Sequence, residues 1–241
     1  MNDAAIGIFD SGIGGLTVMR ALVARLPHEE FVYLGDTARL PYGTKSGDTV
    51  TRYAVQAAGA LMKRKVKMLV VACNTASAVA LPTLQEMFAP VPVVGVILPG
   101  AEAAVSAAPE GPIAGIATEG TVKGGAYVLA IENHGRSIPV IQQACSLFVS
   151  IAEEGLLEGE IADAIARRYI EPLLAAVPKP KAVVLGCTHF PALKNTIAKV
   201  TGPDIKLVDS AETTARAVEK ILREKSIERA SGSKPSHTFL A

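Results

Sequence analysis

The chain is poor in aromatic residues and contains no tryptophan. Phe, Trp and Tyr together make up 5% of its 241 residues, whereas hydrophobic residues make up 49%. The core must therefore be built largely from Ala, Val, Leu and Ile. Aliphatic cores of this kind are typical of parallel sheets covered by helices, and they argue against an all-β sandwich.

A dominant charge of one sign is also lacking. The 24 basic and 23 acidic residues leave a formal net charge of +1. Such a chain has no broad electrostatic field to attract nucleic acid or an anionic membrane, so neither is expected as a partner. We see no apolar run near the ~20 residues that a membrane-spanning helix needs. A signal peptide is not expected either, because Asn2 and Asp3 lead directly into a predicted strand.

Cysteine is scarce, with only Cys73, Cys145 and Cys187 in the chain. A small, odd number of cysteines does not suit a disulfide framework and is typical of a reducing compartment. The sequence therefore predicts a cytoplasmic protein.

What the chain does contain is a regular alternation of short aliphatic runs and longer, helix-like segments. The runs predict strands at residues 5–9, 31–35, 67–72, 91–97, 113–117, 138–141, 182–186 and 205–208. The segments between them predict helices at residues 15–26, 47–64, 75–87, 100–107, 122–133, 158–176, 191–200 and 211–225. This alternation indicates an α/β fold with parallel sheets. Beyond Arg223 the chain is polar and mixed in charge, so we expect a helix end and then loose chain.

The two halves of the chain resemble each other. Residues 6–12 and 114–120 both predict a strand that ends in a polar turn, and Cys73 and Cys187 both end aliphatic runs. The two pairs of features are separated by similar lengths of chain. We therefore predict a duplicated α/β unit with a pseudo-twofold relation, and residues 98–100 as the first crossover. The alternative is that any α/β chain repeats a strand, a polar loop and a helix.

Cys73 stands at the end of an aliphatic strand pattern. Asn74 and Thr75 follow it and suit the start of a helix, where free N–H groups attract a carboxylate and lower the pKa of a thiol. Open α/β sheets place their chemistry just beyond the carboxyl ends of their strands. We therefore expect Cys73 at the edge of an active site, although a small buried core residue is the plain alternative.

Cys187 occupies the matching place in the second half. Thr188 and His189 follow it, and Pro191 suits the first turn of a helix. A histidine two residues away can orient or deprotonate the thiol, and it can equally cap or pack locally. Cys145 has no polar neighbours of this kind, so a structural role is expected for it.

Two further loops provide candidate residues. The glycines of residues 10–15 let backbone N–H groups approach a small anion, but Thr17 stands where a dinucleotide fingerprint needs glycine. Asp10 is then available for acid/base chemistry near a thiol, or it caps the next helix. The Pro-Tyr-Gly turn at residues 41–43 can hold a carboxylate or simply turn the chain.

Glu153 and Glu154 follow the apolar run at residues 148–151. A carboxylate that leaves a strand near the cleft can orient a histidine. The default interpretation is a solvated pair at the start of a helix.

Together, these segments resemble the glutamate racemases, cofactor-independent members of the aspartate/glutamate racemase family. The resemblance is carried by residues 9–16, 36–46, 72–77, 147–149 and 185–191, with residues 209–210 near the end. These segments span most of the chain in the order of the family. Residues 36–46 and 185–191 are the most specific of them.

The resemblance implies two domains, residues 1–97 with 207–241 and residues 98–206, with the active site in the cleft between them. It implies Cys73 and Cys187 as the proton-transfer thiols. It further implies that Asp10 supports Cys73, that His189 supports Cys187, and that Glu153 lies near His189. The implied substrate-binding residues are Asp10, Ser11, Pro41, Tyr42, Gly43, Asn74, Thr75, Thr118, Thr121, Thr188 and His189.

The resemblance also implies the reaction, which is racemisation of L-glutamate to D-glutamate without a cofactor or a metal. Cys73 would act on the D-enantiomer and Cys187 on the L-enantiomer. The product would supply D-glutamate for bacterial peptidoglycan, and a homodimer is plausible.

Three other interpretations stay open at this point. An aspartate racemase, or another isomerase of the same superfamily, would share the catalytic pair and differ in its side-chain pocket. A zinc site formed by Cys73, Cys187 and His189 is a second possibility, although it lacks Cys-x-x-Cys spacing. A non-catalytic α/β protein that binds a small ligand is the third.

Overall fold

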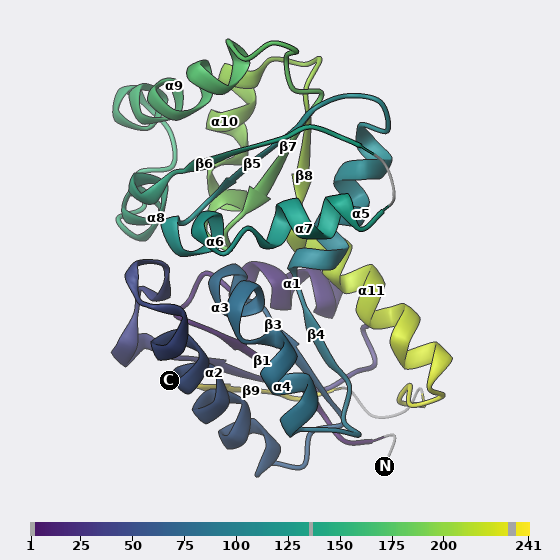
Figure 1. Cartoon of the computed structure of the whole chain (residues 1–241). Helices are drawn as coiled ribbons and strands as arrows, with labels where there is room; N and C mark the ends of the chain where they lie inside the picture. Colours follow the sequence, from purple (N-terminus) through teal and green to yellow (C-terminus); the bar gives the residue numbers. More distant parts are fainter. Residues whose placement is uncertain (1–2, 135–136, 231–234) are drawn as a thin grey trace. The chain divides into compact units, whose positions relative to one another are not determined.

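The computed structural model describes residues 3–134, 137–230 and 235–241. The chain divides into two compact α/β units (Figure 1), the first formed by Met1–Val96 with Ala211–Ala241 and the second by Ile97–Ser210. No helix among the described residues has the length and apolar character needed to cross a membrane.

The first unit is built on a five-stranded parallel sheet in the order β4-β3-β1-β2-β9. Its strands are β1 (Ile6–Asp10), β2 (Phe31–Gly35), β3 (Met68–Val71), β4 (Val93–Gly95) and β9 (His237–Leu240). Its helices are α1 (Leu16–Arg25), α2 (Gly47–Met62), α3 (Asn74–Val79), α4 (Leu81–Met87) and α11 (Ser210–Glu224), with the short 3-10 turns η1 (Thr37–Arg39) and η2 (Tyr42–Thr44).

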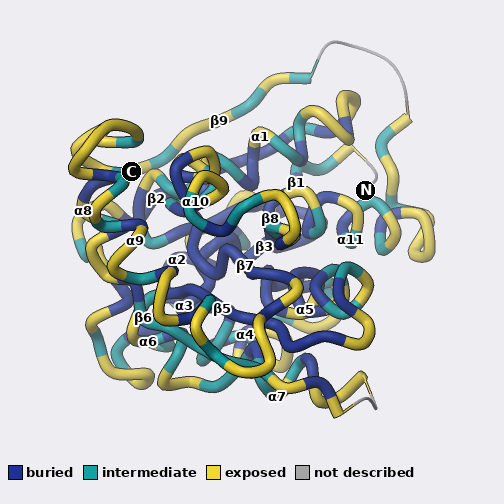
Figure 2. The backbone as a smooth tube through the Cα atoms, turned by 90° about the horizontal axis from the view of Figure 1, so that it is seen from above, coloured by how far each residue is buried: buried dark blue, intermediate teal, exposed yellow. Residues whose placement is uncertain are grey.

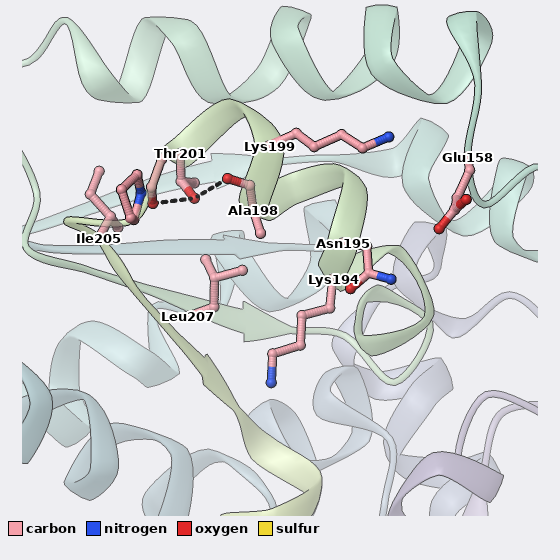
Figure 3. Close-up of a pocket in the computed structure, with 10 residues that line it drawn as sticks. Glu158, Lys194, Asn195, Ala198, Lys199, Thr201, Ile205 and Leu207 are labelled. Atoms are coloured by element: carbon pink, nitrogen blue, oxygen red, sulfur yellow. Dashed lines mark hydrogen bonds between the residues drawn. The ribbon is translucent and has the colours of Figure 1, made fainter.

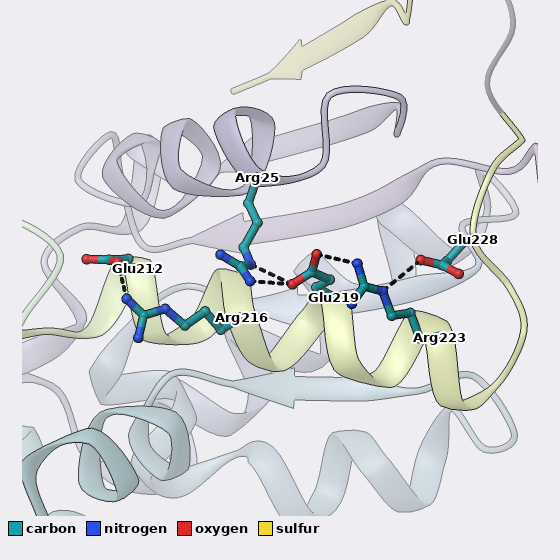
Figure 4. Close-up of polar contacts among 6 residues, drawn as sticks. All are labelled: Arg25, Glu212, Arg216, Glu219, Arg223 and Glu228. Carbon is teal, nitrogen blue, oxygen red and sulfur yellow. Dashed lines mark hydrogen bonds and ion pairs between the residues drawn. The ribbon is translucent and has the colours of Figure 1, made fainter. Parts of the chain in front are cut away.

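Helices cover both faces of this sheet, which explains the unbroken aliphatic runs of its central strands. β1 and β3 are buried at every position (Figure 2). Because successive strand residues point to opposite faces, Ile8 and Val70 pack in the layer of α1 and α11, whereas Phe9 and Val71 pack in the layer of α2, α3 and α4. On the first layer, Arg25 Nε donates to Glu219 Oε2 at 2.7 Å and thereby joins α1 to α11 (Figure 4).

The second unit contains a four-stranded parallel sheet in the order β6-β5-β7-β8. Its strands are β5 (Ile113–Ala117), β6 (Val140–Ala144), β7 (Ala182–Gly186) and β8 (Lys206–Asp209). Its helices are α5 (Ile97–Ala107), α6 (Glu119–Lys123), α7 (Ala126–Glu132), α8 (Ser146–Glu153), α9 (Glu160–Leu174) and α10 (Lys194–Thr201), with the 3-10 turn η3 (Phe190–Leu193). α5 and α7 pack on one face, and α8, α9 and α10 pack on the other.

The structure confirms the predicted α/β class and all eight predicted strands, whose bounds agree within about three residues with those of β1 to β8. The prediction of loose chain at the C-terminus is wrong for residues 237–240. These residues form β9, which pairs in parallel with β2. Aromatic side chains of β9 and β2 also pack together, since the ring centroids of Phe239 and Tyr33 are 6.4 Å apart. A four-residue strand beside a polar stretch leaves little periodic pattern in the sequence.

Two predicted helices are each divided in the structure. Residues 75–87 form α3 and α4, which meet at Ala80, because Pro82 in the first turn of α4 cannot donate the N–H that a continuous helix requires. Residues 122–133 are divided between α6 and α7, where Gly125 adopts a left-handed φ of 61°.

The passage between the units lies about two residues before the predicted crossover at residues 98–100, which themselves lie inside α5. Pro99 is tolerated there because N–H groups in a first turn have no partner within the helix. The two compact units divide immediately before this helix, between Val96 and Ile97.

Candidate functional site

Parallel pairing brings the candidate residues of the first unit to one edge of its sheet. Phe9 pairs with Val71, so Asp10 at the end of β1 and Cys73 beyond the end of β3 lie at neighbouring strand ends. β2 ends beside them at Gly35. The carboxyl ends of parallel strands are where open α/β sheets bind ligands.

Asp10 is completely buried and organises the glycine-rich loop that follows it. Its Oδ2 accepts hydrogen bonds from the backbone N–H of Gly12 at 3.1 Å and of Gly15 at 3.0 Å. The second contact leaves no room for a side chain, since a Cβ at Gly15 would lie 2.5 Å from Asp10 Cβ. Asp10 therefore shapes the loop before α1 from a position close to Cys73.

Cys73 is 4% exposed and occupies the N-cap position of α3. Its Sγ accepts a hydrogen bond from Ala76 N–H at 3.5 Å and lies 3.6 Å from Ser11 Oγ. Burial, and then the charge of Asp10, raise the pKa of Cys73 to about 11, although the contacts to Ala76 and Ser11 act in the opposite direction. The expected lowering of this pKa is therefore wrong, because desolvation outweighs the N–H groups.

Asn74 and Thr75 begin α3 and are 3% and 4% exposed, beside the thiol in sequence. The Pro-Tyr-Gly turn leads into η2, in which Tyr42 and Gly43 are buried while Pro41 is exposed.

A carboxylate at the end of β2 holds that turn in place. Tyr42 Oη donates a hydrogen bond to Asp36 Oδ2, and Arg39 Nε donates to Asp36 Oδ1 at 2.9 Å. The guanidinium of Arg39 lies 4.5 Å from the ring centroid of Tyr53. We predicted no role for Asp36 or Arg39 from the sequence. The only available signal was a carboxylate directly after a strand.

In the second unit, Cys187 follows β7 and is 6% exposed. Its Sγ lies 3.6 Å from Nδ1 of His189, and Nε2 of His189 lies 3.3 Å from Oε1 of Glu153. The three side chains form a thiol–imidazole–carboxylate series, in which the carboxylate can orient the ring and the ring can exchange a proton with the sulfur.

Glu153 reaches His189 from a helix rather than from a strand. Both sequence interpretations of its location are wrong, because Glu153 is the last residue of α8. The hydrophobic run before it is amphipathic: Phe148 and Ile151 are buried. Phe148 packs edge-on against Phe190 with centroids 5.3 Å apart, and this contact ties α8 to the turn that follows His189.

Thr118 and Thr121 lie at the neighbouring strand end. Ala117 pairs with Gly186, so Thr118 and Cys187 each stand one residue beyond a paired position. Thr121 N–H donates to Thr118 Oγ1 at 3.4 Å, which caps α6, and the two hydroxyl oxygens are 3.0 Å apart. Thr188, beside Cys187, is 4% exposed.

Cys145 differs from the other two thiols. It is completely buried and its Sγ contacts the carbonyl oxygen of Gln143 at 3.5 Å. Burial, and then the neighbouring Cys187, raise its pKa strongly. The surroundings are those of a structural, unreactive thiol, as we expected from the sequence.

Two hollows on the described surface contain none of the predicted site residues. One, of about 750 Å³, lies beside α10 and β8 of the second unit, with Lys194, Lys199 and Glu158 at its border (Figure 3). The other, of about 360 Å³, lies in the first unit between the segment before β4 and the end of α11. Within the described residues, no cluster of three or more His, Cys, Asp or Glu side chains is arranged to hold a metal ion.

Comparison with known proteins gives consistent matches over nearly the whole chain. The family model for Asp/Glu/Hydantoin racemase matches residues 6–218. A glutamate racemase of Geobacter metallireducens is 49% identical over 235 residues, which cover 98% of this chain and 86% of that protein.

Solved structures agree with this match. The glutamate racemase of Francisella tularensis, crystallised in complex with D-glutamate, has a TM-score of 0.92 at 37% identity and covers 99% of this chain and 88% of its own. The glutamate racemase of Thermus thermophilus, in complex with β-chloro-D-alanine, has a TM-score of 0.89 at 43% identity and covers 99% and 87%.

Proposed function

Because this chain belongs to the Asp/Glu/Hydantoin racemase family and is an amino-acid racemase, we propose that it interconverts L- and D-glutamate without a cofactor. Cys73 and Cys187 are the two proton-transfer groups of this proposal. The observation that carries it is that each unit holds a buried thiol just beyond a parallel strand with polar support of its own, which is Ser11 for Cys73 and His189 for Cys187. The D-glutamate bound by the Francisella relative supports the choice of substrate.

Two thiols suit this reaction because inversion of an α-carbon needs proton removal from one face and delivery to the other. A thiolate abstracts the α-proton, and the electron pair stays on the α-carbon as a carbanion. The opposite thiol then donates its proton to the other face, and the two sulfurs have exchanged protonation states. Cysteine suits both roles because its ordinary pKa of ~8.5 can be tuned toward neutrality. The proposal requires both sulfurs to reach one α-carbon.

The carbanion must be stabilised by electrostatics alone, since no cofactor accepts the electrons. Hydrogen-bond donors directed at the substrate carboxylates supply that stabilisation in a site shielded from water. The side chains proposed for it follow the same or neighbouring strand ends as the thiols. They are Ser11, Asn74 and Thr75 in the first unit, and Thr118, Thr121 and Thr188 in the second unit.

Substrate binding must also activate Cys73. With a pKa of about 11, its thiol is protonated at neutral pH. The substrate carries an α-ammonium group whose positive charge favours a thiolate and offsets the negative charge of Asp10. Asp10 then has two functions in this scheme, which are to shape the Gly12–Gly15 loop and to attract the ammonium group.

Cys187 is supported by His189 instead. The imidazole accepts the thiol proton when Cys187 must act as a base, and Glu153 stabilises the imidazolium that results. We further propose that the reaction takes place in the cytoplasm, where thiols stay reduced. The D-glutamate that the reaction forms is used for peptidoglycan. The active enzyme can be a homodimer.

The decisive experiment uses the purified protein with L-glutamate alone and follows optical rotation. In D₂O, early turnover is expected to place deuterium at the α-carbon of the newly formed D-glutamate, because the donating thiol has exchanged its proton for a deuteron from the solvent. Cys73→Ser and Cys187→Ser should each abolish most of the racemisation, whereas Cys145→Ser should retain it. Undiminished turnover by either of the first two variants rejects the two-thiol scheme. Faster turnover of D-aspartate than of D-glutamate rejects the substrate assignment.

A further inference from the structure

Tyr33 is a buried tyrosine in a strand whose other side chains are mainly aliphatic. It stands in the middle of β2, opposite Ile8 of β1, and it is 3% exposed. Its hydroxyl donates a hydrogen bond of 2.8 Å to the backbone carbonyl of Gly12. The side chain therefore crosses from the second strand to the loop that begins at the end of the first.

With that hydrogen bond, both backbone polar groups of Gly12 in the glycine-rich loop are held, an arrangement called here the Gly12 clamp. The N–H of Gly12 donates to Asp10 Oδ2 at 3.1 Å, while the carbonyl oxygen of Gly12 accepts from Tyr33. Gly35 also packs closely against this carbonyl group, because a Cβ at Gly35 would lie 2.6 Å from the same oxygen. A Cβ at Gly15 would lie 2.9 Å from the tyrosine oxygen.

The Gly12 clamp acts on the thiol of Cys73 through one residue, Ser11. Ser11 lies between Asp10 and Gly12 in the chain, and its Oγ is 3.6 Å from Cys73 Sγ. When the residues on both sides of Ser11 are held, the hydroxyl of Ser11 has little freedom to leave the sulfur. The same bonds keep the carboxylate of Asp10 at its place beside the thiol.

The chemistry of Tyr33 suits a holding role rather than proton transfer. Burial, and then the charges of Asp10 and Cys73, raise the pKa of Tyr33 far above neutrality. Its hydroxyl therefore stays protonated and remains a donor. The ring itself packs in the aliphatic layer and against Phe239, contacts that phenylalanine would also make.

We propose that Tyr33 is a positioning residue for the racemase reaction, which holds the Asp10–Gly12 loop in register with Cys73 through the Gly12 carbonyl. This inference rests on the proposed function of the two thiols. In this scheme Tyr33 acts through the backbone of Gly12 and not through a contact of its own with the substrate.

The test compares Tyr33→Phe with Thr196→Val in the full-length enzyme. Thr196 is a matched control, because its buried hydroxyl also donates to a loop carbonyl, that of Leu157, at 2.7 Å. Each variant loses one such hydrogen bond and should lower Tm by about 2–6 °C. Tyr33→Phe should also lower kcat/KM for glutamate by about 10–100-fold, because small misplacements of reacting groups have effects of that size. Thr196→Val should stay within about threefold of wild type.

The pH profile of kcat/KM separates positioning from simple loss of stability. Asp10 and Ser11 influence the pKa of Cys73, so loosening them in Tyr33→Phe should shift the midpoint of the profile, whereas Thr196→Val should not shift it. Gly35→Ala offers a second route, since its methyl group would displace the same Gly12 carbonyl while Tyr33 is retained. It should reproduce the loss and the shift even if Tyr33→Phe folds poorly.

Two results would overturn the inference. One is a Tyr33→Phe enzyme whose kcat/KM matches that of Thr196→Val. The other is a loss of activity with an unchanged pH midpoint, which indicates a structural role only. Both leave the proposed function intact, because that function fails only if the wild-type enzyme does not racemise glutamate or if the cysteine variants remain active.

Discussion

Nδ1 of His189 lies 3.6 Å from Sγ of Cys187. The ring is fixed by its position two residues after the thiol and by Glu153, whose Oε1 lies 3.3 Å from Nε2. The contact gives Cys187 a partner that can accept and return its proton. Cys73 has no histidine among its described contacts and is influenced instead by Asp10. The two thiols therefore depend on different chemistry for the same task.

This difference predicts the effect of His189→Gln. The amide keeps a polar side chain of similar reach but cannot accept the thiol proton. We expect kcat to fall by about 10²–10⁴-fold, the usual range for loss of a general acid–base group. Turnover from L-glutamate and from D-glutamate should be measured in parallel, with circular dichroism to establish folding. Because the two enantiomers are equal in free energy, kcat/KM must fall equally in both directions. A variant with wild-type kcat contradicts the role of His189.

Glu153→Gln should have a smaller effect than the histidine substitution. The amide retains the shape of the carboxylate and removes the charge that stabilises an imidazolium. Glu153 has a side chain 35% exposed, so solvent weakens that charge. We expect kcat to decrease by about 3–30-fold, with little change in Tm. A neighbouring substitution, Glu154→Gln, serves as the control. Equal activities of the two variants would mean that Glu153 does not support the ring.

Asp10→Asn should lower the pKa of Cys73 below its value of about 11. A nearby negative charge disfavours the thiolate, so its removal favours ionisation, whereas the contribution of burial remains. Iodoacetamide alkylation of Cys73, followed by peptide mass spectrometry over pH, should show its midpoint at lower pH than in wild type. Racemisation should nevertheless decrease, because the loop exchanges a charged acceptor for a neutral amide oxygen and the substrate ammonium group loses its counter-charge.

The same digests contain an internal control. Cys145 is completely buried and its pKa is strongly raised, so it should react slowly in both proteins. If the Cys73 midpoint in Asp10→Asn stays the same or rises, Asp10 does not act on this thiol through its charge.

A buried ion pair predicts a stability effect away from the thiols. Lys67 Nζ lies 2.7 Å from Glu29 Oε2, and each side chain is 4% exposed. Glu29 also accepts the backbone N–H of Arg229 at 2.8 Å, which ties the residues after α11 to the segment before β2. Glu29→Gln removes the negative charge beside a buried ammonium group and should cost about 3–5 kcal/mol.

The exposed pair Glu212–Arg216 on α11 provides the control (Figure 4). Both of its side chains are more than half exposed, so Glu212→Gln should cost at most about 1 kcal/mol. Because the two units have separate cores, their unfolding need not be two-state. Hydrogen exchange of β2 and β3 peptides in urea therefore measures the first unit directly. Equal protection in both variants would show that the buried pair contributes little.

Much of the fold and several site residues could be predicted from the sequence. The strands β1, β3 and β7 appear as continuous aliphatic runs because helices cover both faces of their sheets. Once these runs are parallel strands, Cys73 and Cys187 must lie at the carboxyl ends. Local spacing also predicted the contact between Cys187 and His189 as one of two alternatives.

Other features depend on contacts between distant parts of the chain and left no local signal. β9 exists because residues 237–240 pair with β2, more than 200 positions earlier. The helical state of residues 148–153 depends on the packing of Phe148 against Phe190, and that packing brings Glu153 to His189. The hydroxyl of Tyr33 matters only because β2 lies beside the loop that follows β1.

The sequence by itself determined the parallel strands and the positions of both thiols at strand ends, because the aliphatic run of a buried strand and the residue that ends it are local properties of the chain. The tertiary structure decided the state of those thiols. Cys73 stands beside helix-starting residues, which favours a lower pKa, yet burial and Asp10 from another strand raise it to about 11. Desolvation and charge act through space, so the ionisation of a thiol follows from its folded surroundings rather than from its neighbours in sequence.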